Sequence, residues 1–275
     1  RYRLQQILVP IDQSLATFGR RIKDQPSVQM VYARLNVVPS ELFQEAVINA
    51  FFQDPNGKIP PLSEAGLVKW RGAIFRGSAE SDYGKELRWN AETRLQPWLA
   101  GKVVSRNQLM NEGVEVYQNR TASSTDILHE YFVPRDQAGA FVAAMRRILP
   151  QHKANLLNVT VRSVNEDQDT FLRYADQPLM AFVMLFLQDR TPAGEAQMQA
   201  VTRELIDAAL AQGGRYYLPY RLHATPAQFE AAYPQAREFF KLKRKHDPEE
   251  LFQNQFYLKY GQAEPSKSGR GEEKR

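Results

Sequence analysis

A dense group of hydrogen-bonding side chains lies in GGRYYLPYRLH, residues 213–223, with three tyrosines, two arginines and a histidine within nine residues. Phenol hydroxyls and guanidinium groups bind polar and anionic ligands through directed hydrogen bonds. A regular strand here places Tyr217 and Arg221 on one face and Tyr216 and Tyr220 on the other, unless the proline shifts the register. The segment therefore predicts a strand that lines a polar binding site.

A second candidate group lies in NVTVR, where polar residues alternate with valines. In a strand, Asn158, Thr160 and Arg162 share one face, and the valines share the face toward the core. An arginine beside a hydroxyl and an amide suits a hydroxylated or anionic ligand. A solvated sheet face is the commoner use of this pattern and remains the alternative.

HEYFVP adds a carboxylate, Glu130, as a candidate substrate ligand. Neighbouring strand residues face opposite ways, so His129 does not pair with Glu130, and Tyr131 suits the core or a pocket wall. The four histidines are too scattered for a metal site, and the chain has no HExxH, P-loop, GxGxxG or GxSxG motif. We expect no metal.

The composition is that of an ordinary globular protein, with 275 residues, 43% hydrophobic and 24% charged. The longest apolar run, MAFVMLFL, has eight residues, so no membrane span is expected, and the N-terminal sequence lacks a signal-peptide pattern. The absence of cysteine excludes disulfides and fits a reducing compartment, so we expect a cytoplasmic protein. A net charge of +5 suits an anionic ligand or partner.

Hydrophobic periodicity and turn signals predict the elements of the chain. In the first half we expect strands at 2–9, 27–38 and 67–77, a helix or strand at 41–52, a loop at 54–66, and helices at 82–100 and 105–118. In the second half we expect strands at 126–134, 156–164, 180–187 and 215–221, and helices at 137–149, 191–214 and 225–248.

The order of the second half is strand–helix–strand–strand–helix–strand, the split βαβ or ferredoxin-like arrangement. We therefore predict an α+β fold, an antiparallel sheet with helices on one face and the other face free to cover a ligand. Thr191 and Thr225 are predicted N-caps, and Pro234 a break in the last helical region. We expect a first half over 1–125, a ferredoxin-like half over 126–261, and a disordered tail over 262–275.

Residues 213–261 resemble the carboxyl end of FAD-linked oxidases of the vanillyl-alcohol oxidase superfamily, nearest the D-arabinono-1,4-lactone and alditol oxidases. The motifs that carry the resemblance are Gly213-Gly214-Arg215, Ala232-Tyr233-Pro234, the segment KRKHDP at 243–248, and Phe252-Gln253-Asn254. Upstream, EYFVPR at 130–135 and NVTVRSV at 158–164 resemble strands of the same substrate domain, the second of which bears an active-site arginine.

The resemblance implies that this chain is the cap, or substrate, domain of a two-domain enzyme whose amino-terminal FAD-binding domain holds the cofactor. Its sheet would cover the flavin ring, and an alcohol carbon would be oxidised by hydride transfer to the flavin. Arg162 would stabilise charge there, and Asn254, with Gln253, would approach the flavin. Hydrogen bonding at a helix end is the alternative role for Asn254.

Two departures from the family pattern affect the expected chemistry. The alditol branch has a glutamate where this chain has Thr160. The lactone branch has a lysine that Tyr220 or Arg221 would replace here, and alignment on His223 gives Arg221. An arginine is always charged and is a poor proton acceptor. If this position needs a base, a tyrosine must then provide it, or the mechanism differs.

Two other functions remain open. The first is a non-enzymatic ferredoxin-like module for an anionic ligand or RNA, although the wholly apolar third strand at 180–187 disfavours stacked bases, so we expect no nucleic-acid partner. The second is a reductase or dehydrogenase of the same superfamily that does not use oxygen.

Overall fold

The computed structural model describes residues 1–23, 25, 27–62, 68–79, 81–95, 103–111 and 117–262. The strands are β1 Tyr2–Pro10, β2 Val28–Leu35, β3 Glu45–Gln53, β4 Val103–Val104, β5 Ser124–Pro134, β6 Asn155–Val164, β7 Leu179–Asp189 and β8 Arg215–Tyr216. The helices are α1 Ile11–Lys23, α2 Val68–Ala79, α3 Asp82–Asn90, α5 Arg106–Met110, α6 Ala138–Gln151, α7 Pro192–Ala211, α8 Pro226–Ala232, α9 Ala236–His246 and α10 Gln255–Tyr260. Short 3-10 turns occupy Pro39–Glu41 and Arg135–Gln137, and a π-helical turn, Ala91–Leu95, follows α3.

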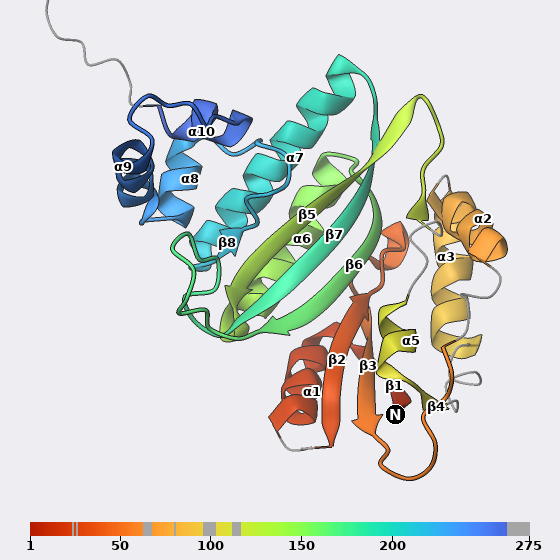
Figure 1. The fold of residues 1–275 in the computed structure, drawn as a ribbon. Coiled ribbons are helices and arrows are strands. Elements are labelled where there is room, and N and C mark those ends of the chain that lie inside the picture. The colour runs from red at the N-terminus through yellow and green to blue at the C-terminus, as the bar shows by residue number, and fades with distance from the viewer. Residues whose placement is uncertain are drawn as a thin grey trace, which may run out of the picture.

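All eight strands join in one sheet of order β4-β1-β3-β2-β6-β7-β5-β8, and every strand pair is antiparallel. Each half of the sheet contributes four strands in the same spatial order. From the outer edge of the sheet to its middle, this order is the fourth, first, third and second strand of that half. The halves join through β2 and β6, where Ala33 pairs with Val161 and Arg34 with Thr160. The predicted α+β class is confirmed, and the joint makes one continuous face from both halves (Figure 1).

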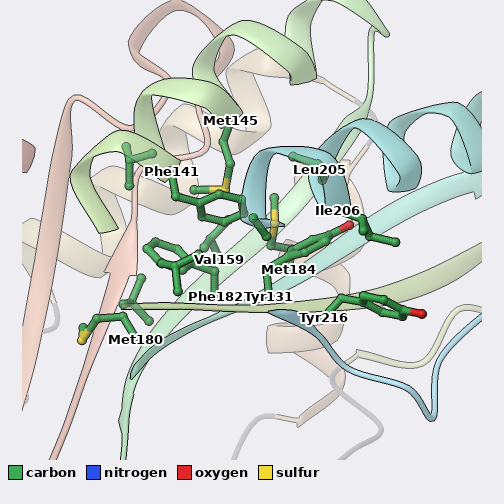
Figure 2. Packing of buried hydrophobic residues seen from close by; sticks show 14 of the residues in the cluster. Tyr131, Phe141, Met145, Val159, Met180, Phe182, Met184, Leu205, Ile206 and Tyr216 are labelled. Atoms are coloured by element: carbon green, nitrogen blue, oxygen red, sulfur yellow. The ribbon is translucent and has the colours of Figure 1, made fainter. Parts of the chain in front are cut away.

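The main core lies between the sheet and the helices α6 and α7. Figure 2 shows Phe141 and Met145 of α6 and Leu205 of α7 above Val159 and Tyr131, side chains of the sheet. Alternate residues of each strand supply this side, as the period of two requires.

The predicted strand at 67–77 is wrong, because this segment forms α2. Its apolar residues Phe75 and Ala79 lie four apart, on one helical face, and pack against Leu157 of β6. In α3, Trp89 packs with Val47 of β3. Both contacts lie on the face opposite α6 and α7, so helices cover part of the face predicted to be free (Figure 1). The part of that face left beside these helices is called the open face below.

The segment 41–52, ambiguous between helix and strand, is largely strand β3. The predicted helix at 82–100 is α3 and the π-helical turn as far as Leu95, and the one at 105–118 is α5, which ends at Met110. Residues 96–100 and 112–116 of these two segments, and the predicted tail from 263 onward, lie outside the described residues. No helix among the described residues is both long and apolar enough to cross a membrane.

The helix caps of the second half are confirmed. The Thr191 hydroxyl accepts a hydrogen bond from the Gly194 amide, and Thr225 forms a capping box with Gln228. Helices α8 and α9 are separate, with Pro234 between them. The predicted strand at 215–221 is wrong beyond Tyr216, because the chain turns at 218–220 and does not continue the sheet.

Candidate functional site

The floor of the candidate site is a row of side chains across four strands. Arg34 of β2 pairs with Thr160 of β6, which pairs with Val183 of β7, which pairs with Glu130 of β5. Neighbouring strands lie about 4.8 Å apart, so this row spans the open face. Arg162 lies two residues beyond Thr160 on the same face and is exposed. Both NVTVR and HEYFVP therefore bring their polar side chains to one surface.

An aromatic wall borders this floor. Tyr174 stacks on Phe132 with ring centroids 4.2 Å apart and an interplanar angle of 19°. Tyr217 meets Tyr174 edge-on at 5.5 Å, and Tyr220 meets Tyr217 at 5.2 Å. Such pairs fix ring orientation while leaving hydroxyl groups available for polar contacts. The wall and the floor together suit a ligand with both a ring face and hydroxyl groups.

Glu130 is the partly buried carboxylate of this site. Burial raises the pKa of Glu130, and the charge of Arg162 and a hydrogen bond from the Tyr220 hydroxyl act in the opposite direction. The pKa of Tyr220 is also raised, first by burial and next by the charge of Glu130. These effects couple the three side chains, which come from three separate segments of the chain.

The regular alternation within 215–221 ends at the turn that contains Pro219, which is the change of register that the sequence left open. Tyr216, paired with Tyr131, is buried on the helix side, as expected for the opposite face from Tyr217. Tyr220, however, contacts Tyr217 and Glu130 on the open face, because the strand ends at Tyr216 and the turn reverses the expected direction. The structure thus brings both candidate tyrosines to the site.

Arg221 lines a small cavity together with Glu130, Tyr217 and Tyr220, and its guanidinium is held there by other contacts. Its guanidinium pairs with Glu195 in the first turn of α7, and the same carboxylate accepts from the Gln188 amide at 2.9 Å. His223 lies 2.8 Å from the other oxygen of Glu195. Both Gln188 and His223 are buried, on the helix side of the sheet. These contacts do not bring Arg221 to the Arg162 guanidinium, and its catalytic role stays a prediction.

The remaining candidates differ in their local roles. The Asn158 amide donates to the Thr160 hydroxyl at 3.4 Å, which keeps both on the open face. The Asn254 side chain accepts from the Tyr257 amide at 2.8 Å and caps α10. Gln253 is exposed beside it. Asn254 therefore has the helix-end role named above as its alternative, and the flavin contact of both residues stays a prediction.

Sequence reasoning missed a buried chain of hydrogen bonds behind the site. The Tyr131 hydroxyl lies 3.0 Å from His129 Nδ1, and Thr202 Oγ1 lies 3.3 Å from His129 Nε2 and 2.9 Å from His223 Nδ1. The chain ends at Glu195 on the surface. Burial, with the charges of His223 and Arg221, lowers the pKa of His129 to about 3. No local signal marks this chain, because the fold alone brings its members together.

The loop that carries Tyr174 was also missed. Arg215, the third residue of GGR, forms an ion pair with Asp176 and donates to the Arg173 carbonyl at 2.6 Å. Arg215 is buried, so these bonds fix the loop against β8. The aromatic wall thus depends on a motif residue that does not itself line the open face. No cluster of three or more metal-ligating side chains occurs among the described residues.

The family model for D-arabinono-1,4-lactone oxidase matches residues 87–260. The match spans more than half of the chain and includes the β5 and β6 residues of the open face, and the chain belongs to this family of FAD-linked oxidases. Among solved structures, 4-ethylphenol oxidase from Gulosibacter chungangensis, in complex with isoeugenol, is similar with a TM-score of 0.48 and 14% identity, over 89% of this chain. The chain spans about half of that enzyme, 51%. No curated protein matches.

Proposed function

We propose that this chain is the substrate domain of an FAD-dependent oxidoreductase that oxidises a CH–OH group of a polyol, a sugar lactone or a similar alcohol. The family match over residues 87–260 carries the proposal. The polar row and aromatic wall of the open face support it, because they offer hydroxyl-binding groups beside a surface that suits a planar ring.

An FAD-binding domain is the proposed partner, and FAD, when bound, supplies the hydride acceptor. The donor set of the open face fits that chemistry. Arg162 presents a permanently charged guanidinium, and Tyr217 presents a hydroxyl within the wall. In this proposal Arg162 binds the substrate oxygen and stabilises the negative charge that develops on it.

The other candidates orient the substrate. Asn158 and Thr160 hold each other by a hydrogen bond and offer their remaining donors and acceptors to secondary hydroxyl groups. Such neutral groups recognise a polyol or lactone without adding charge. Arg221 has no step in this proposal, because Glu195 occupies its guanidinium. In this proposal the Asn254 side chain contacts the flavin and also caps α10 at the same time.

The test uses the full-length polypeptide with its FAD-binding domain and bound flavin. Polyols and aldonolactones are mixed with it without oxygen, and loss of flavin absorbance is followed. We expect at least one substrate to reduce the flavin, and readmission of oxygen then separates an oxidase from a dehydrogenase. If neither substrate class reduces the flavin, the proposed function is wrong.

Arg162→Ala tests the assigned surface. We expect flavin reduction to slow by about 100-fold or more, since an electrostatic group of this kind contributes on that scale. Arg237→Ala is the control, because Arg237 is exposed and pairs only at the surface with Glu230. Full activity in Arg162→Ala would refute the placement of the substrate on the open face.

A further inference from the structure

We propose that Glu130 is the proton acceptor of this reaction, an inference that rests on the proposed function. The hydroxyl proton of the substrate passes to the Glu130 carboxylate. FAD, when bound, would supply the acceptor for the hydrogen on the adjacent carbon, which would leave with its electron pair as a C=O bond forms. The proton on Glu130 and the two electrons taken up by the flavin then balance the oxidation of the alcohol to a carbonyl compound.

The position of Glu130 is the first argument. It lies in the same cross-strand row as Thr160, separated from it by Val183 of β7. Glu130 is the carboxylate among the paired residues of this row, and it lies on the same surface as Arg162.

The other candidate bases are excluded by their chemistry or their contacts. Arg221 is always charged and pairs with Glu195. Burial and the nearby Glu130 charge raise the pKa of Tyr220, which makes its hydroxyl harder to ionise. Glu92 lies 3.6 Å from Arg34, and Asp176 is taken up by Arg215.

The surroundings of Glu130 suit a base that must be ionised before each turnover. Burial raises the pKa of Glu130 above that of an exposed glutamate, which strengthens it as a proton acceptor. The Arg162 charge and the Tyr220 hydrogen bond oppose this shift and favour the carboxylate. A small cavity, about 20 Å³, is lined by Glu130, Tyr217, Tyr220 and Arg221 among others, so space for about one water molecule lies beside these residues.

Tyr220 has a positioning role in this proposal. Its hydroxyl donates to Glu130, and the Tyr217 amide donates to the Glu130 carbonyl at 3.0 Å, which fixes the backbone beneath the side chain. Loss of the Tyr220 hydroxyl removes a bond that lowers the pKa of Glu130. In Tyr220→Phe, the pKa of Glu130 therefore moves upward while the carboxylate remains.

The experiment measures flavin reduction against pH in the full-length holoenzyme. Glu130→Gln should lower the limiting rate by about 100- to 10,000-fold and abolish the acidic limb of the pH profile, with substrate affinity changed much less. Tyr220→Phe should keep that limb and move it to higher pH. Glu86→Gln makes the same chemical change on the exposed surface of α3 and should match the unmodified enzyme.

A second readout does not depend on turnover. In an NMR titration of protein labelled with ¹³C-glutamate, the Glu130 carboxyl signal is the one absent from Glu130→Gln. We expect its pKa to lie above the range of exposed glutamates and to rise further in Tyr220→Phe. An unchanged acidic limb in Glu130→Gln, or a loss confined to substrate affinity, overturns the role of Glu130 while the proposed function stands. An unmodified holoenzyme that no alcohol reduces overturns both. If Glu130→Gln does not fold, the Glu130 signal is assigned as the one that shifts in Tyr220→Phe, and a signal that titrates like those of exposed glutamates, or no shifted signal, overturns the role.

Discussion

The buried His129 predicts a specific loss of stability on mild acidification. Its pKa falls from 6.5 to about 3 in the folded protein, chiefly through burial, whereas the unfolded chain titrates near the ordinary value. The unfolded state therefore binds more protons between these pKa values, and stability rises with pH across that window. Stability is lost as the pH falls below about 6.5, and the loss ends below about 3.

The magnitude follows from these two values. Between pH 7.5 and pH 5, the cost of keeping His129 neutral in the folded state grows by about 2 kcal/mol. His223 acts in the same direction, because burial lowers its pKa too, although hydrogen bonding and the charge of Glu195 oppose that shift. Glu130, with a raised pKa, acts in the opposite direction as the pH rises.

Urea unfolding at pH 7.5 and pH 5 measures this difference. We expect His129→Gln to lose about 2 kcal/mol less than the unmodified protein over that interval, even if it is less stable at both values. His246→Gln is the control, because His246 is exposed at the end of α9. Equal losses in the unmodified protein and His129→Gln, or a His129 ring signal that titrates near pH 6.5 in the folded protein, would refute the reasoning.

Three further variants test local parts of the fold. Gly214→Ala should destabilise the protein strongly, because a Cβ there would lie 2.3 Å from the Phe132 carbonyl oxygen. Gly77→Ala is the control and should be tolerated, because a Cβ at that position meets nothing within 4 Å. Thermal unfolding compares the two variants. Thr225→Ala removes a capping box and should lower the free energy of unfolding by about 1 kcal/mol in urea titrations. Asn254→Ala should lower the free energy of unfolding by about the same amount, whereas Asn254→Asp keeps the helix cap. A lower flavin affinity in Asn254→Asp at equal stability would therefore indicate a contact between Asn254 and the cofactor.

Strand periodicity predicted the parts of the site that depend on local geometry. The alternation in NVTVR correctly assigned Thr160 and Arg162 to one face, and the same rule separated Glu130 from His129. These assignments need only a strand and a core on one side of it. They do not need the identity of the neighbouring strands, which is why one sequence was enough.

Contacts between distant segments were not predictable in this way. The approach of Thr202 to His129 spans 73 residues, and no spacing rule connects a mid-helix threonine to a strand histidine. The position of Tyr220 depends on where β8 ends, and a proline predicts an interruption but not the direction of the chain after it. For α2, β-branched and aromatic residues favoured a strand, and packing of Phe75 on Leu157 decided for a helix.

The glycines and arginine of GGR show how a family motif can act on a site indirectly. Gly213 has φ of +69°, a conformation that ends α7 at low cost only in a residue without a side chain. Gly214 allows the chain to approach Phe132 so closely that β8 pairs with β5. Arg215 then holds the loop of Tyr174, which stacks on Phe132. The motif therefore builds the aromatic wall beside Glu130, whereas the residues proposed above to carry the chemistry lie on β5 and β6.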